Sequence, residues 1–380
     1  MSSLSRFLAA VIAAFSSLTF AQVPPPRVRL AVNFDTLPRP PVPSDVLEIV
    51  NEAQAVQDAQ QRLDAIASLE KARVLSNVRA QPYDLKTSFV SSGGLASDGN
   101  WTLEDISRGR MYRWTAQGPN YSAIQMYPDS ARGMLYSNQP GGVIPLRLAQ
   151  VRAAIFFAYQ MPGPQASVRT AVGFLNGVEQ SCVLVVIGAG NRSFSGGRNW
   201  EESEYCMDSK TGLLTTYSPV PGLFVHYDYA SAVTFHGKII PGSFTITEAG
   251  RTVTEARTLS VTDPVDSKDT SFNPSGLAPV GVGRAMNPPA NFRSLISAPG
   301  RPLPSSSANV AVQVVVLHGN VSQDGRLSET EILASSDASL NQAALERAYT
   351  TNLGAGQNQP GVTPQSREIF LTFEFVTPGR

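Results

Sequence analysis

Alternating apolar and polar positions mark the C-terminal end of the chain as a β-β-α-β unit. Valines occupy every second position in Val310–Leu317, which is the period of a strand with one buried face. Asp324-Gly325 indicates a turn, and Leu327–Ala334 returns as a second strand. Leu340–Tyr349 has apolar residues at helical spacing, and Glu368–Phe375 alternates again as the last strand.

Residues 83–262 show many short strand patterns separated by turn residues. Asn176-Gly177 is the clearest turn, because both residues tolerate the positive φ of a type I′ hairpin. One helix interrupts the strands, with Pro145 in its first turn and an apolar face from Leu146 to Tyr159. Short turns between consecutive strands predict a curved antiparallel sheet, which can cup a helix or an apolar ligand. The predicted strands are Tyr83–Ser91, Trp101–Ile106, Met111–Ala116, Tyr121–Tyr127, Arg132–Tyr136, Ser167–Phe174, Val178–Ile187, Glu204–Cys206, Leu213–Tyr217, Phe224–Tyr229, Ser243–Thr247 and Arg251–Val261.

The remaining segments are expected to lead into or connect these two regions. Residues 1–21 combine Arg6 with an apolar run and predict an export signal; an uncleaved membrane anchor is the alternative. Residues 22–43 are rich in proline and predict an extended arm that acts as a spacer. Residues 44–82 have helical apolar spacing and predict an amphipathic helical region. Residues 263–309, rich in Pro, Ser and Gly, predict a linker.

Composition narrows the possible partners. Of the 380 residues, 42% are apolar, which is enough to build cores. Thirty basic and thirty acidic residues cancel, and no Lys/Arg cluster stands out, so no nucleic-acid partner is expected. The only cysteines are Cys182 and Cys206. In an exported chain such a pair predicts a structural disulfide, with two free thiols as the alternative.

The sequence offers little material for catalysis. Its three histidines, His226, His236 and His318, lack metal-ligand spacing, and each is expected at the surface or hydrogen-bonded. No Gly-x-Ser-x-Gly elbow occurs. The acidic run Glu201-Glu202-Ser203-Glu204 predicts a solvated charged segment. We therefore expect no catalytic residues, no cofactor and no metal site, and a non-enzymatic protein, with a hydrolase site scattered along the sequence as the alternative.

The middle region resembles the LolA and LolB family of lipoprotein carriers. The resemblance covers residues 83–262 and rests on Trp101-Thr102-Leu103, Tyr112-Arg113-Trp114 and Phe235–Pro241. It implies a half-barrel whose apolar concave face holds a lipid or an acyl chain.

The C-terminal unit resembles the C-terminal domain of TonB proteins over residues 310–376. The resemblance rests on Asp324–Leu327, Ile332, Ser335-Ser336, Leu340 and Ala343-Ala344-Leu345. The chain departs from the family at Tyr349–Leu353, where a Trp-x-Phe-x-Pro segment usually stands. The resemblance implies docking to an envelope protein, partly by strand addition at an open sheet edge. The candidate edge strand presents Glu368, Phe370, Thr372 and Glu374; a paired and buried strand is the alternative.

These patterns together predict an α+β fold, in which a curved antiparallel half-barrel with helices is linked to a small ββαβ TonB-like domain. The predicted function is protein–protein interaction by a non-enzymatic envelope protein, in the context of envelope transport. A periplasmic carrier of lipid or lipoprotein acyl chains is the alternative. The expected location is the periplasm or the exterior. Membrane contact is expected only if the N-terminal segment stays uncleaved and anchors the chain in the inner membrane.

Overall fold

The computed structural model describes residues 37–43, 48–49, 54–72, 81–128, 133–140, 142–156, 166–186, 197–265, 272–282, 292–298, 310–322, 324–351, 353 and 367–378. They belong to one unit of the fold, Leu37–Arg380. The predicted export signal and the first part of the proline-rich arm lie outside the described residues. No helix in the described part of the chain is long and apolar enough to span a bilayer.

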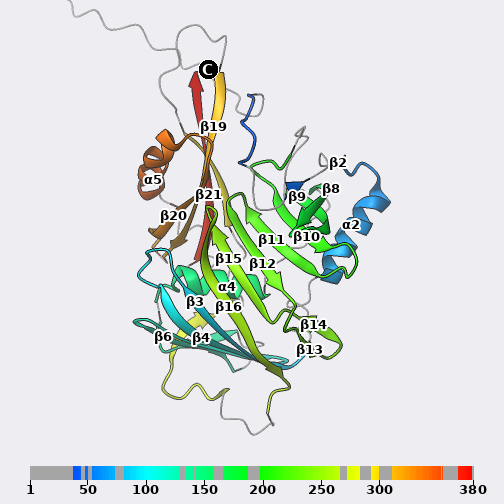
Figure 1. Ribbon diagram of the computed structural model, residues 1–380. Helices are drawn as coiled ribbons and strands as arrows, with labels where there is room; N and C mark the ends of the chain where they lie inside the picture. Colours follow the sequence, from blue (N-terminus) through cyan, green and yellow to red (C-terminus); the bar gives the residue numbers. More distant parts are fainter. Residues whose placement is uncertain are drawn as a thin grey trace, which may run out of the picture. The chain divides into compact units, whose positions relative to one another are not determined.

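An open antiparallel sheet forms the larger part of the fold (Figure 1). Among the described residues, its two terminal strands do not pair with each other, so the sheet is open. This open sheet confirms the type of sheet predicted for residues 83–262. In order it contains β1 (Glu48–Ile49), β8 (Ser167–Leu175), β9 (Val178–Val186), β10 (Ser203–Asp208), β11 (Leu214–Val220), β12 (Leu223–Asp228), β15 (Ser243–Glu248), β16 (Arg251–Thr262), β3 (Tyr83–Ser91), β4 (Gly99–Arg108), β5 (Met111–Gly118), β6 (Tyr121–Tyr127), β7 (Met134–Ser137) and β17 (Ala278–Val282).

The predicted hairpin between β8 and β9 is present. Asn176 and Gly177 form its turn with φ values of 50° and 77°, so both residues adopt the positive φ that a type I′ turn requires. A smaller separate hairpin pairs β13 (Val233–Phe235) with β14 (Lys238–Ile240).

Part of the predicted helical region forms strands. Among the described residues of 44–82, helix α2 covers Ala59–Ala72, and two short strands, β1 and β2 (Gln54–Ala55), precede it. Both strands pair with β8. A strand at a sheet edge carries unpaired backbone groups, and these accept the two segments.

The predicted linker also contains strands. Strand β17 pairs with β7 at the end of the large sheet. Strand β18 (Phe292–Ala298) pairs with the last strand of the chain. Residues 263–309 therefore contribute one strand to each sheet, which a purely flexible connection would not do.

The C-terminal region has the predicted β-β-α-β order. Its elements are β19 (Val310–Val321), β20 (Leu327–Ser335), the short 3₁₀ turn η4 (Ala338–Leu340), α5 (Asn341–Thr350) and β21 (Arg367–Pro378). Together with β18 these strands form a separate sheet in the order β18-β21-β19-β20. One face of that sheet packs on α5, in a core that contains Val315, Leu317, Val321, Ala344, Ala348, Ile369, Leu371, Phe373 and Phe375.

Strand β21 is not an open edge, so the prediction that it is the edge strand to which a partner adds is wrong. It pairs with β19 on one side and with β18 on the other. Glu368, Phe370, Thr372 and Glu374 are only 4%, 1%, 4% and 1% exposed. The physical reason is that β18, supplied by the predicted linker, occupies the edge that the β-β-α-β unit alone would leave free. Residues on both faces of β21 are buried, as is typical of an interior strand.

Helix α4 (Leu146–Phe156) contacts both sheets. It lies against the large sheet in Figure 1, and all its described side chains are buried. The hydroxyl of Tyr227 on β12 donates to the carbonyl of Ala154 at 2.8 Å. From the other sheet, Glu329 accepts a hydrogen bond from the amide of Leu146 at 2.6 Å. The C-terminal sheet is therefore packed onto the rest of the fold through α4.

A tight turn brings the two sheets into direct contact. Gly222, between β11 and β12, has a φ of 85°, and a Cβ at this position would overlap the carbonyl of Leu333 on β20. Only glycine allows both this backbone conformation and this close approach.

The described end of the proline-rich arm, residues 37–43, packs against the C-terminal sheet. The amide of Val312 donates to the carbonyl of Pro38 at 3.1 Å. The guanidinium of Arg39 donates to the carboxylate of Glu374 at 2.7 Å. This part of the arm is thus bound to the fold, in contrast to the predicted spacer.

Candidate functional site

A row of aromatic side chains crosses one face of the large sheet. The strand register places Tyr227 opposite Phe244, Phe244 opposite Ala256, Ala256 opposite Phe89, and Phe89 opposite Trp101. Residues directly opposite each other in an antiparallel sheet point to the same face. Four aromatic side chains therefore lie along one line across β12, β15, β16, β3 and β4.

The row extends beyond Trp101. The Trp101 ring stacks on Phe89 with centroids 5.4 Å apart, and it lies 5.8 Å from the ring of Tyr121 on β6. Between them, on β5, stands Gly118, where an added Cβ would overlap the indole ring. Glycine at this position leaves room for the indole to lie flat on the sheet.

The C-terminal half of α4 covers the same face. Arg152 stacks over the Trp114 ring at 4.3 Å and donates to the hydroxyl of Tyr112 at 2.7 Å. Its guanidinium also lies 3.4 Å from the Asp105 carboxylate, which accepts a hydrogen bond from Tyr112. Burial raises the pKa of Tyr112 well above its usual value, so the phenol remains a hydrogen-bond donor. The aromatic face is thus covered by a helix that contacts it through the Arg152 guanidinium and through the carbonyl of Ala154.

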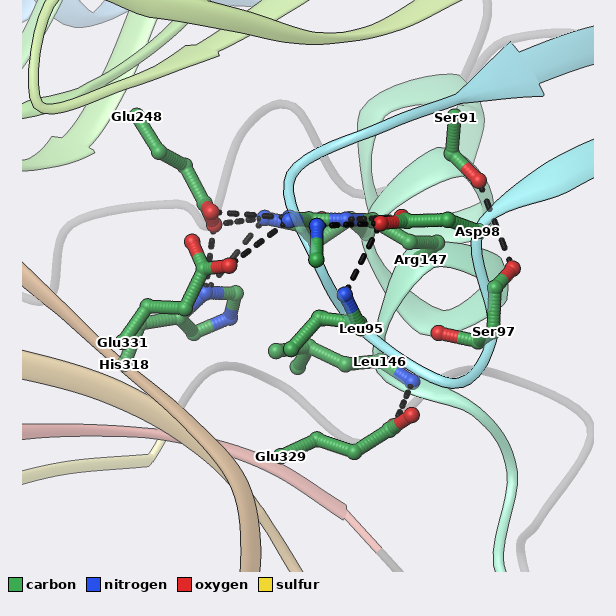
Figure 2. Close-up of polar contacts among 12 residues, drawn as sticks. Ser91, Leu95, Ser97, Asp98, Leu146, Arg147, Glu248, His318, Glu329 and Glu331 are labelled. Atoms are coloured by element: carbon green, nitrogen blue, oxygen red, sulfur yellow. Dashed lines mark hydrogen bonds and ion pairs between the residues drawn. The ribbon is translucent and has the colours of Figure 1, made fainter.

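The N-terminal half of α4 enters a buried ionic cluster (Figure 2). Arg147 donates to Glu248 on β15 at 2.8 Å and to Glu331 on β20 at 2.9 Å. Its Nε lies 3.4 Å from Asp98, and its side chain is fully buried. Gln150, one turn along the helix, accepts from Arg147 at 3.0 Å and donates to Glu248.

His318 on β19 stands at the opposite side of this cluster. Its Nδ1 lies 2.7 Å from Glu248 and its Nε2 lies 2.8 Å from Glu368 on β21. The ring also stacks on Phe370, with centroids 4.9 Å apart. Two carboxyl partners are best satisfied by an imidazolium, in which both ring nitrogens donate.

The pKa values of the cluster follow from burial and charge. Burial alone would lower the pKa of His318, but the hydrogen bonds and charges of Glu248 and Glu368 outweigh it and raise that pKa to about 9. Burial would raise the pKa of Glu248, yet His318 and Arg147 hold it well below its ordinary value. Burial and the neighbouring Glu248 raise the pKa of Glu331 to about 7. At neutral pH the cluster therefore contains two cations around an ionised Glu248.

A loop between β3 and β4 closes the cluster. The Asp98 carboxylate accepts from the amides of Gly94 at 2.6 Å and Leu95 at 2.8 Å, which fixes the loop beside Arg147 (Figure 2). Gly93 has a φ of 142°, and a Cβ there would lie 2.6 Å from the Arg147 guanidinium. The loop can approach the cation this closely because that position lacks a side chain.

Chemically, the cluster is suited to holding elements together. Its acidic and basic groups bind one another, and they come from α4, β15, β19, β20, β21 and the loop after β3. Removing one member of such a buried set leaves an uncompensated charge, which costs several kcal/mol. The cluster therefore makes the docking of the C-terminal sheet depend on Arg147.

The structure joins Cys182 and Cys206 in a disulfide between directly opposite positions of β9 and β10. Both residues are buried. Within the described residues, the group of side chains suited to binding a metal is this pair with Glu204. In the disulfide the two sulfurs are no longer thiolates, which are the form that ligates metals.

The acidic run is not solvated, in contrast to the prediction. Glu202 forms a two-point ion pair with Arg169 on β8, with both distances 2.7 Å, and Glu204 lies 3.3 Å from Arg198. Both carboxylates are buried. The arginines that neutralise them come partly from a distant strand, so the run alone gave no sign of its burial.

The histidines differ in their environments. His236 lies at the surface, 2.7 Å from Asp263, and half-buried His226 lies 3.3 Å from the hydroxyl of Thr216. Only His318 enters the cluster, as a hydrogen-bonded histidine. One local signal pointed to its burial, because it continues the apolar face of β19 that starts at Val312 and includes Val314 and Val316. A polar side chain on such a stripe needs a buried partner.

Scans against protein-family models and against curated proteins find no match. Three solved structures show distant similarity. A LolA superfamily protein from Nitrosomonas europaea is 10% identical with a TM-score of 0.36, over 55% of this chain and 96% of that chain. A domain described as an outer membrane lipoprotein-sorting protein, from Vibrio parahaemolyticus, is 8% identical with a TM-score of 0.35, over 56% and 97%. A DUF1329 family protein from Desulfovibrio piger is 8% identical with a TM-score of 0.35, over 59% and 100%. Similarity at this level assigns no family, so the proposed function rests on the geometry.

Proposed function

We propose that this protein is a non-catalytic, exported carrier that holds an apolar ligand, a lipid or an acyl chain, on the aromatic face of its large sheet. One observation carries the proposal: a row of aromatic side chains, interrupted at Ala256, crosses the face of the sheet on which α4 lies. A linear hydrocarbon matches the shape of such a row. Burying its surface there contributes about 25 cal/mol per Å².

In this proposal the ligand takes the place of part of α4. Where it covers the row, the helix is held by the hydrogen bond from Tyr227 and by Arg152 over Trp114. An acyl chain that slides between helix and sheet exchanges one apolar cover for another, so most of the aromatic surface stays out of water throughout. The described structure then represents the empty, closed form of the carrier.

The non-catalytic part of the proposal has its own support. The charged groups of the ionic cluster, among them Arg147, Glu248 and His318, bind one another, and the aromatic row adds no ionisable group except its phenols. Export is supported by the disulfide between Cys182 and Cys206, because such bonds persist in oxidising compartments. On this basis we propose the periplasm or the exterior as its location.

Docking of an envelope protein at β21 is less well supported. Glu368 binds His318 and Glu374 binds Arg39, so the residues proposed for a partner already have partners within the chain. The TonB resemblance remains a prediction, and we retain an envelope partner only as a second component of a transport role.

Quenching of tryptophan fluorescence by 9,10-dibromostearate tests the carrier proposal. The chain has three tryptophans. Trp101 belongs to the aromatic row, whereas Trp200 donates to the carbonyl of Pro40 in the arm. A Trp114→Phe/Trp200→Phe variant emits from Trp101 alone, and a Trp101→Phe/Trp114→Phe variant emits from Trp200 alone.

Because bromine quenches indole only at short range, we expect saturable quenching of Trp101 and almost none of Trp200. Unbrominated stearate should displace the probe and restore the emission. Equal quenching of the two variants, or no quenching of either, would contradict the proposal.

A further inference from the structure

Helix α4 belongs to two interaction sites at once. Its first turns supply Arg147 and Gln150 to the buried ionic cluster. Its last turns place Arg152 over Trp114 and Ala154 against Tyr227, above the aromatic face. The helix has 11 residues, a length of roughly 16 Å at 1.5 Å per residue. A rod this short moves as a unit, so a shift at one end is felt at the other.

We propose that α4 couples occupancy of the aromatic face to the docking of the C-terminal sheet, so that a bound apolar ligand releases that sheet. This inference rests on the proposed carrier function and adds its regulation. The C-terminal sheet reports whether the carrier is loaded, because its attachment depends on the helix that the ligand displaces.

Several contacts between the C-terminal sheet and the rest of the fold go to α4 and to the segment just before it, beside the direct contacts between His318 and Glu248 and at Gly222. Glu331 accepts from Arg147, and Glu329 accepts from the amide of Leu146. Asn320 on β19 donates to the carbonyl of Ile144. Each of these bonds is lost when the start of α4 moves away.

The cluster does not survive the loss of its arginine. Without Arg147, the carboxyl groups of Glu248 and Glu331 would face each other in a buried site, with His318 as the remaining cation of the group. A buried carboxylate without its cation is unfavourable by several kcal/mol. Hydration relieves this cost, and water reaches the carboxylates when the two sheets separate.

The released sheet keeps its own core. The residues that pack on α5, including Leu317 and Phe373, lie on the face of the sheet opposite to His318 and Phe370. Release therefore exposes the second face without unfolding the unit. Linkage adds a further consequence: a change that weakens the docking of the sheet strengthens ligand binding, by at most the factor by which docking is weakened.

Distance measurements between two spin labels test the coupling in the full chain. Val90 on β3 and Tyr349 on α5 are 52% and 57% exposed, so cysteines at these sites accept labels without disturbing the core. Cys182 and Cys206 stay in their buried disulfide. We expect one narrow distance distribution for the empty protein, and a longer, broader one when stearate is added.

Two variants separate the cluster from general stability. Arg147→Met should give the long distribution without stearate and bind stearate about fivefold tighter or more. Glu331→Gln, a milder change that keeps the shape of the side chain, should give a mixture of both distances. Arg169→Met is the matched control, because Arg169 on β8 is also a buried arginine but pairs with Glu202 instead of with the ionic cluster. It should behave like the parent protein in both respects.

The outcomes distinguish this inference from the proposed function. Quenching of Trp101 by the brominated probe together with a lengthened distance supports both. Quenching of Trp101 with an unchanged distance between the spin labels overturns the coupling, while the proposed carrier function stands. Absence of quenching overturns the carrier proposal, and the coupling with it.

Discussion

Loss of the proton on His318 should weaken the fold by an amount that follows from its surroundings. Its pKa is raised to about 9, against 6.5 for the free side chain, because two carboxyl groups outweigh the effect of burial. At 1.36 kcal/mol for a tenfold change in proton affinity, this difference corresponds to about 3 kcal/mol of stability. Because the folded pKa is the higher one, the contribution is complete below pH 6.5 and disappears as the pH rises through 9.

Urea unfolding of the parent protein and of a His318→Gln variant measures this contribution. We choose the range from pH 7.5 to 10, because Glu331, with a pKa of about 7, has then largely ionised. The difference in unfolding free energy between the two proteins should shrink by about 2 kcal/mol over this range. Because the lysines and tyrosines elsewhere in the chain titrate in both proteins, their effect cancels in the difference between the two unfolding free energies.

A difference that stays constant from pH 7.5 to 10 would refute the reasoning, because it would mean that His318 is already neutral in the folded chain. Nuclear magnetic resonance of the histidine rings gives an independent check even if the variant folds poorly. Three ring signals are expected. One should titrate near pH 9, and that of His226 below its usual value, because burial lowers its pKa.

Two further substitutions test the packing. Gly118→Ala should lower the unfolding free energy by about 1–3 kcal/mol, because the new methyl group overlaps the Trp101 ring. Gly197→Ala, where no atom lies within 4 Å of the added carbon, should leave the urea midpoint nearly unchanged; equal midpoints for both variants would contradict this packing. Replacing Cys182 and Cys206 by serine should cost about 3 kcal/mol in the chain-entropy model, since the bond closes a loop with a sequence separation of 24. Mass spectrometry after alkylation should detect their thiols only in unfolded, reduced protein, and labelling of the native protein would contradict the buried disulfide.

The local sequence pattern was sufficient to predict those features that depend on residues close together in the chain. The turn at Asn176-Gly177 was predictable because two adjacent residues both tolerate positive φ, and the turn alone fixes the register of β8 and β9. The order of β19, β20, α5 and β21 followed from apolar periods of two and of three to four residues. Each of these features depends on residues that are neighbours in the chain.

Pairing at sheet edges depended on distant segments. The alternation in β21 was recognised, but its use as an open edge was wrong, because β18 comes from a stretch rich in turn residues and pairs with it. The two short strands β1 and β2 were likewise taken as helix, since their apolar spacing fits either period and only the free edge of β8 decides. A strand pattern shows which faces are apolar, and it carries no information on which edges are occupied.

The candidate sites show the same division. Aromatic residues of β4 and β5 were recognised in the sequence, whereas the row that crosses the sheet could be seen only from the register of five strands. The ionic cluster was not foreseeable, because Arg147 lies 101 positions from Glu248 and His318 lies 70 positions from it. Composition and periodicity determined that this chain builds an antiparallel sheet and a smaller ββαβ unit. Only the tertiary structure decided that the two are joined through α4 and through the direct contact of His318 with Glu248, because a buried charge selects its partner by proximity in space and leaves no local pattern.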